Sequence, residues 1–346
     1  MLAVLAGALA WSGLASLPQE RAAPRPAVAA SEPAAPTWRA RGDMELYARI
    51  AARMAAGEGY YAAALGEQRA SGYPTRPFVT VRLPTLAWLQ TAIGTFGLRL
   101  AALGLAAACL LALWWRKPAM GCGPERLAAS ILVLLGGGAA LSPVAGYDHD
   151  FIAGMLLTLA LLAYHPDRWW PALLAAGAAL AMRELAAPFV LLWLGFALAG
   201  RHWREAAGLT ALLALFALGL AWHAAAVEAA RLPGDLASQG WNAMTGYGLP
   251  LASLGQLTGL RFLPAHFAAP LAILPLVGWA GLGGRNGLFA ALWFTGLATM
   301  IALFARPANF YWIELGLPAY ALGLAFAPRA TWELARTAFG PTSRQT

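Results

Sequence analysis

The polar residues best suited to chemistry gather in one stretch, residues 41–85, of a sequence that is otherwise almost entirely apolar. The stretch holds four of the sixteen acidic residues, Asp43, Glu45, Glu58 and Glu67, together with Tyr47, Tyr60, Tyr61 and Tyr73. Asp43 stands at the start of an expected helix, where a carboxylate can take a proton from a hydroxyl group or bind a metal ion. We therefore predict that Asp43 is a reacting or metal-binding carboxylate at a membrane surface.

Plainer roles are also open for two acids of this stretch. Asp43 can cap the N-terminus of the helix, which is compatible with catalysis because a capping carboxylate is already oriented. Glu45 precedes Arg49 by four residues, a spacing at which side chains on a helix form ion pairs. We favour this pairing for Glu45 over a second functional acid.

A second acidic cluster is the run Gly146–Asp150, with Asp148, His149 and Asp150 in succession. Ionisable side chains beside hydrocarbon are costly and usually line a functional cavity. Such a density of carboxylates suits a divalent metal ion or two acids that share one proton. The alternative is a solvated loop in which Asp150 caps the next helix.

Two further groups supply positive charge. Arg183 either pairs with the adjacent Glu184, which we favour, or faces a cavity, where its planar guanidinium would bind a phosphate. Arg306 is followed by Asn309 and Tyr311, which together offer several donors for an anionic head group. All five residues are candidate substrate-binding residues.

The composition indicates the fold class. With 60% hydrophobic and 12% charged residues, the chain differs from soluble globular proteins, in which about a quarter of residues are charged. We predict an all-α polytopic membrane protein. The net charge of +8 is spread singly over short loops, so it indicates topology rather than nucleic-acid binding. The two cysteines suggest neither a disulfide framework nor a metal site.

About ten membrane crossings are predicted, since about 20 apolar residues span the hydrocarbon layer. They are expected near residues 1–17, 95–115, 125–144, 151–164, 169–183, 185–200, 206–227, 264–283, 287–305 and 313–328. The whole chain, 1–346, is then a single integral membrane domain. Residues 18–84 form a first extracytoplasmic loop and residues 329–346 a short cytoplasmic tail.

Within the first loop, the Pro/Ala-rich residues 18–36 suit a flexible lead-in. Residues 44–56 have the periodicity of an amphipathic interfacial helix, which the Gly57–Gly59 break ends. With the N-terminus inside, ten Lys and Arg residues fall in inner segments and four in short outer loops, which matches the cytoplasmic retention of basic residues. The polar clusters then share the outer face.

The order of these features resembles the polytopic GT-C glycosyltransferases, especially the family-39-like and family-87-like bacterial members. The resemblance is carried by about 45 residues: Gly42 to Arg49, the helix end Met54 to Tyr61, then Arg76-Pro77 and Arg82-Leu83-Pro84 before the next helix. An acid followed within a few residues by a Tyr, a Gly-rich helix end and a Pro-containing return are typical of those enzymes. The rest of the chain matches only in helix number and loop alternation.

The resemblance implies sugar transfer from a polyprenyl-phosphate donor to a lipid, glycan or protein acceptor on the periplasmic face of a bacterial inner membrane. Asp43 matches the catalytic acid of the first loop, and Asp148 and Asp150 lie where a second acid is often placed. Arg306 lies where phosphate-binding groups are found late in the chain. Tyr47, Arg76 and Arg82, which carry the resemblance, and His149 of the second acidic cluster are further substrate-binding candidates, and a divalent metal ion is a candidate cofactor.

Two departures from the family pattern keep other functions open. Met44 occupies the second position of the usual Asp-Glu pair, and no soluble C-terminal domain follows the last crossing. A transporter or flippase of a lipid-linked molecule would use the same charges to bind and release its cargo, but transporters usually place acids near the bilayer midplane and contain repeats. A non-catalytic protein that retains the fold is the third reading.

Overall fold

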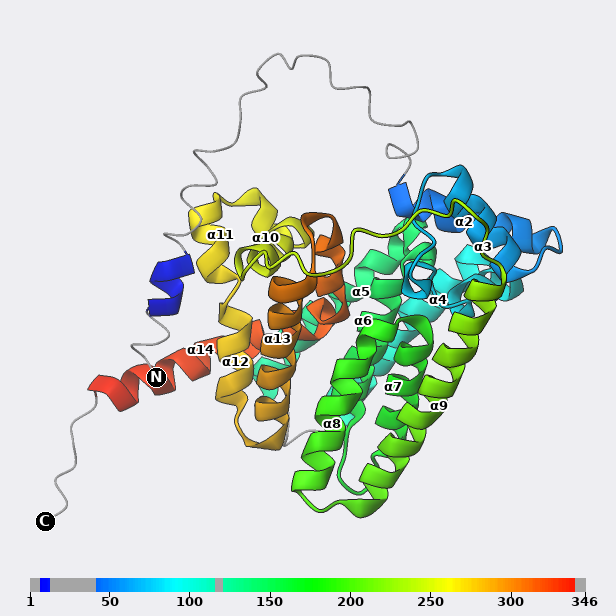
Figure 1. Ribbon diagram of the computed structural model, residues 1–346. Helices are drawn as coiled ribbons and strands as arrows, with labels where there is room; N and C mark the ends of the chain where they lie inside the picture. Colours follow the sequence, from blue (N-terminus) through cyan, green and yellow to red (C-terminus); the bar gives the residue numbers. More distant parts are fainter. Residues whose placement is uncertain (1–6, 13–41, 116–120, 340–346) are drawn as a thin grey trace, which may run out of the picture.

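The computed structural model describes residues 7–12, 42–115 and 121–339. This part of the chain is helical, as the composition predicts, and one isolated bridge joins Arg76 to Ala237. The elements in Figure 1 are α2 (Gly42–Ala55), α3 (Tyr60–Ala70), η2 (Phe78–Thr80), α4 (Thr85–Trp115), α5 (Gly123–Gly137), η3 (Gly138–Leu141), η4 (Pro143–Tyr147), α6 (His149–Ala163), α7 (Trp170–Met182), η5 (Glu184–Ala186), α8 (Ala187–Ala199), α9 (Trp203–Ala229), α10 (Gly248–Leu257), η6 (Gly259–Phe262), α11 (Ala265–Leu271), α12 (Leu274–Leu282), α13 (Gly284–Phe304), η7 (Pro307–Leu315) and α14 (Leu317–Phe339).

Five helical segments are long and apolar enough to cross a membrane, and the bent pair of η7 and α14 makes a sixth. They account for the predicted crossings at 95–115, 125–144, 206–227, 264–283, 287–305 and 313–328. The count of ten is not supported by length. Helix α6 has 15 residues and α7 and α8 have 13 each, so they extend only about 20 Å, less than the roughly 30 Å of hydrocarbon.

The predicted segments at the two ends of the chain compare differently with the structure. The crossing at 1–17 and the lead-in at 18–36 lie largely outside the described residues. The predicted cytoplasmic tail begins at Arg329, but α14 continues without interruption to Phe339. The last helix is therefore longer than the apolar run, because residues 329–339 are rich in strong helix formers such as Ala, Arg, Glu and Leu.

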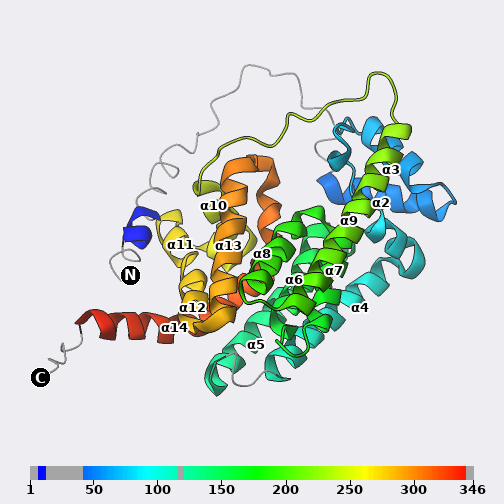
Figure 2. The same cartoon turned by 60° about the horizontal axis from the view of Figure 1, so that its bottom comes forward.

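The helices form two groups, which Figures 1 and 2 show from two directions. Helices α4–α9 form the first group and α10–α14 the second. Helix α14 packs against both α12 and α5, and η7 packs against α6, so these elements join the groups. The connection from α9 to α10, residues 230–247, crosses the end of the molecule that also carries α2 and α3 (Figure 1).

The amphipathic helix predicted at 44–56 is confirmed as α2, and its apolar side chains pack on protein. Leu46 and Ile50 are buried in a cluster with Leu65 of α3 and Val227 of α9. The glycine break is confirmed as well, since Gly57 adopts φ +95° between α2 and α3, a conformation that costs little only for glycine. The helical pair α2–α3 is thus fixed over the ends of the first group.

Close backbone contact holds α12 against α14. A Cβ atom built on Gly278 would overlap the carbonyl oxygen of Gly323, and one built on Gly323 would overlap the carbonyl oxygen of Pro275. Small residues permit such approach where helices pack within a membrane. The two glycines therefore set the distance between α12 and α14.

We expect Gly278→Leu to separate α12 from α14, because the added side chain meets backbone that cannot move aside. Overpacking usually costs about 1–3 kcal/mol, and a backbone clash lies at the upper end. Monodispersity in detergent after a heating series measures the loss. Gly296→Leu on α13 is the control, since a Cβ there meets nothing within 4 Å; equal heat resistance of the two variants would contradict the expectation.

Candidate functional site

Five separate segments bring most of the predicted site residues to one end of the molecule. Helix α2, the residues before α4, the start of α6, the α7–η5 junction and η7 all contribute. We call this cluster the polar site. The residues it contains are Asp43, Tyr47, Tyr73, Arg82, Asp148, His149, Asp150, Arg183, Glu184, Tyr311 and Glu314.

Asp43 lies within the first turn of α2 rather than before it, so it is not the N-cap residue. Its carboxylate accepts a hydrogen bond of 2.7 Å from the hydroxyl of Tyr73. Burial and the nearby Asp43 charge raise the pKa of Tyr73, so the phenol remains a donor. Asp43 also shares a helix face with Tyr47, four residues on. The carboxylate is thus held by the phenol of Tyr73, and its charge acts on the nearby phenol of Tyr47.

Arg82 is the centre of the polar site. Its Nε donates to the hydroxyl of Tyr47 at 3.0 Å, and its Nη2 donates to the hydroxyl of Tyr311 at 3.2 Å. Tyr47 in turn packs edge-on against His149, with ring centroids 4.7 Å apart. No carboxylate among the described residues forms an ion pair with Arg82. A cation placed this way retains its charge for an anionic ligand.

Arg183 is not available to bind phosphate, contrary to the cavity hypothesis. The side chain is 2% exposed, and its Nε donates to Asp150 at 2.8 Å while Nη1 forms an ion pair with Glu184. The favoured pairing with Glu184 is confirmed, and Asp150 is a partner that sequence spacing did not suggest. Two carboxylates around one guanidinium make a buried structural network under the site.

Asp148, not Asp150, caps α6. Its Oδ1 accepts a hydrogen bond from the backbone N–H of Phe151 at 2.9 Å. The carboxyl groups of Asp148 and Glu314 are neighbours. Two buried carboxyl groups so close together repel each other when both are charged, which favours a state in which one of them holds a proton. Glu314 was not among the predicted site residues, although its position three residues after Tyr311 places both on η7.

Four predicted site residues lie apart from this arrangement. Glu45 pairs with Arg49 at 3.1 Å, as its spacing favours. Arg76 is exposed, and its backbone bridges to residues 236–238. The Nη1 of Arg306 donates to Gln239 at 2.8 Å, while its backbone N–H donates to the Asn309 side chain. Asn309 approaches the site through its amide, 3.5 Å from the Tyr311 hydroxyl.

The residues present do not fit a resident divalent metal ion. Among the described residues, no three His, Cys, Asp or Glu side chains are arranged to bind one. Asp150 is paired with Arg183, and Oδ1 of Asp148 already accepts a hydrogen bond from the backbone N–H of Phe151. The chemistry of the site is therefore developed below from its own side chains.

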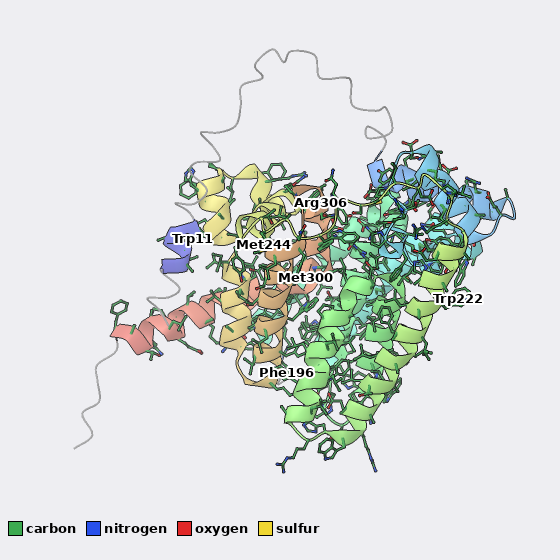
Figure 3. The ribbon with its side chains drawn as sticks, in the orientation of Figure 1. Trp11, Phe196, Trp222, Met244, Met300 and Arg306 are labelled. Atoms are coloured by element: carbon green, nitrogen blue, oxygen red, sulfur yellow. The ribbon has the colours of Figure 1, made fainter. Side chains whose placement is uncertain are left out.

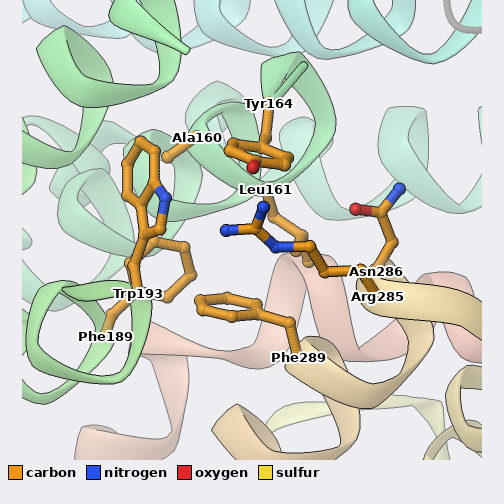
Figure 4. Close-up of a pocket in the computed structure, with 8 residues that line it drawn as sticks. All are labelled: Ala160, Leu161, Tyr164, Phe189, Trp193, Arg285, Asn286 and Phe289. Carbon is orange, nitrogen blue, oxygen red and sulfur yellow. The ribbon is translucent and has the colours of Figure 1, made fainter. Parts of the chain in front are cut away.

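A narrow pocket at the other end of α6 is separate from the polar site (Figure 4). It has a volume of about 20 Å³, enough for one water molecule. Arg285 lies over the ring of Tyr164 at 5.0 Å and pairs at 3.3 Å with Glu205, which also binds Trp193. Because α6 has 15 residues, this pocket is about 22 Å from the polar site along the helix.

Comparison with known proteins gives no relative: no family model, no curated protein and no solved structure matches the chain. The resemblance to GT-C glycosyltransferases therefore remains a prediction from the sequence. Function has to be argued from the polar site itself.

Proposed function

We propose that this protein is a membrane glycosyltransferase of the GT-C type, which moves a sugar from a polyprenyl-phosphate donor to an acceptor hydroxyl. The reaction would take place at the polar site, on the periplasmic face of a bacterial inner membrane. The acceptor hydroxyl would belong to a lipid, a glycan or a protein.

The observation that carries the proposal is that a carboxylate and a guanidinium share the site without pairing with each other. Asp43 is bound by Tyr73, and Arg82 by Tyr47 and Tyr311. In most polar clusters such opposite charges pair directly, as Arg183 and Asp150 do here. Separated by phenols, they can act on the two ends of one substrate, a nucleophile and a leaving phosphate.

The proposed reaction is a single displacement. Asp43 takes the proton from the acceptor hydroxyl as its oxygen forms a bond to the anomeric carbon. The bond between that carbon and the phosphate oxygen breaks, and its electron pair stays on the polyprenyl phosphate. Arg82 binds this anion with the N–H donors that Tyr47 and Tyr311 leave free. One displacement inverts the anomeric configuration.

The other side chains of the polar site support Asp43 and Arg82. Burial raises the pKa of Tyr47 above its ordinary value, so its hydroxyl stays protonated and the positive charge of Arg82 is not neutralised. The ring of His149 packs edge-on against the ring of Tyr47. The Arg183 network joins α6 to η5 under the site.

The test is sugar transfer or release by the purified protein in lipid, with a panel of polyprenyl-phosphate sugars. We expect turnover with at least one donor, and we expect Arg82→Gln to raise the KM for that donor about 10- to 100-fold, since a charge-assisted bond to phosphate contributes about 1.5–3 kcal/mol. Glu228→Gln is the matched control, because Glu228 is half exposed and, among the residues that the structure describes, its ion-pair partner is Arg231.

The outcomes separate the rival functions. Donor binding without turnover of any sugar would exclude the transferase function and favour a flippase or a non-catalytic protein. Turnover that is unaffected by Arg82→Gln would exclude Arg82 as the phosphate ligand, and Arg306 would be the next arginine to test.

A further inference from the structure

A large apolar cavity of about 230 Å³ lies inside the second helix group, between α10, α12, α13 and α14. We call it the apolar cavity. Its lining includes Leu254, Leu276, Leu297, Ala298, Ile313 and Leu317. Trp11 of the short helix at residues 7–12 covers one side, and Figure 3 shows this side chain beside the second group.

Water is a poor occupant of this cavity. A buried water molecule needs two to four polar partners, and the walls are almost entirely hydrocarbon. The cavity also faces the middle of α13, which is one of the candidate membrane spans. An empty cavity of this size forfeits packing with every side chain around it. A hydrocarbon chain is therefore the occupant that the walls favour.

Element η7 separates the apolar cavity from the polar site. Ile313 lines the cavity, whereas Tyr311 binds Arg82 on the other side. The two surfaces of η7 are closely packed: a Cβ atom on Gly154 of α6 would overlap the Glu314 carbonyl oxygen, and one on Gly316 would approach Leu297 to 2.7 Å. A lipid whose phosphate is bound by Arg82 therefore cannot pass its chain through η7 into the cavity.

Arg306 is a positive charge that lies apart from the polar site, beyond the end of α13. Figure 3 shows it at the same end of the group as Met244. Arg306 has no ion-pair partner among the described residues, and its Nε is buried without a hydrogen-bond partner. At 1.5 Å per residue, Arg306 stands about 12 Å beyond Ala298. This spacing suits a lipid with its head group at Arg306 and a chain in the cavity.

We propose that the apolar cavity and Arg306 bind a second lipid, an anionic lipid with acyl chains, and that this lipid is the sugar acceptor. The acceptor role rests on the proposed function, whereas the binding site does not. Donor and acceptor lipids would then lie on opposite sides of η7, with their head groups toward the same end of the molecule. Tyr311 and Asn309 lie between the two head-group positions, with the Asn309 Nδ2 atom 3.5 Å from the Tyr311 hydroxyl oxygen.

The test uses the full-length protein in detergent and phosphatidylglycerol that carries a diazirine on its acyl chain. After illumination, we expect mass spectrometry to locate the label on α10 or α13 peptides that line the cavity. Ala298→Trp fills the cavity and should lower this labelling about tenfold or more, equivalent to at least about 1.4 kcal/mol of binding. Leu288→Trp is the matched control, because Leu288 is exposed on the same helix. Arg306→Gln should also lower the labelling.

Equal labelling of wild type and Ala298→Trp would overturn the site, and so would displacement of the label from these peptides by unlabelled polyprenyl phosphate. Asp43→Asn should leave the labelling unchanged, because Asp43 takes no part in this site. In an active preparation, sugar should appear in the lipid fraction and fall with Ala298→Trp; transfer that is undiminished in this variant would overturn the acceptor role. Labelling with no transfer by wild type would overturn the proposed function while supporting the lipid site.

Discussion

Replacing Asp43 with Asn is expected to lower sugar transfer by about 10²- to 10⁴-fold, the range in which positioned general bases contribute. The amide is nearly isosteric and its oxygen can still accept from Tyr73, so the site keeps its shape. It cannot take a proton from the acceptor hydroxyl. Single-turnover rates with saturating donor measure the chemical step, and donor binding should stay close to that of wild type.

Glu58→Gln is the matched control for this variant. Glu58 lies between α2 and α3 and binds Arg53 at 2.6 Å, and within the described part of the chain it forms no ion pair with the polar site. Full activity of Asp43→Asn would remove this carboxylate from the mechanism. The Asp148–Glu314 pair would then be the next base to test, since it is the other acidic group in the site that has no arginine partner.

The sequence was sufficient for the features that depend on local pattern. Apolar length identified the membrane helices α4, α5, α9 and α13, and periodicity identified α2. Charge spacing found the pairs of Glu45 with Arg49 and of Arg183 with Glu184. These predictions succeed because helix length, the i, i+4 pair of Glu45 with Arg49 and the adjacent pair of Arg183 with Glu184 all depend on residues close in the chain.

Contacts between residues far apart in the chain could not be predicted from the sequence. The contact between Arg82 and Tyr311 joins positions 229 residues apart, and that between Arg183 and Asp150 joins positions 33 apart. No local spacing indicates which of several arginines lacks an acidic partner, so Arg183 and Arg306 were placed ahead of Arg82. The count of ten crossings was unsupported for a related reason: α6, α7 and α8 are apolar but short, and many of their side chains are buried in the protein core.

The Arg183 network gives the largest expected effect on stability. Arg183→Met leaves Asp150 and Glu184 without their cation, and Asp150 is almost fully buried. Removing one partner of a buried ion pair usually costs about 3–5 kcal/mol, because the remaining charge has lost both water and its counter-charge. We expect the variant to unfold at lower temperature in detergent and to be recovered in low yield.

The compensating variant distinguishes lost charge balance from lost packing. Changing Asp150 to Asn and Glu184 to Gln in the Arg183→Met background removes all three charges, and replacing a whole buried network is often nearly neutral. We therefore expect this triple variant to regain most of the heat resistance, and to retain donor binding because Arg82 is unchanged. A stable Arg183→Met protein that has lost donor binding would reverse this assignment, because Arg183 would then be binding the donor phosphate rather than holding Asp150 and Glu184 in place.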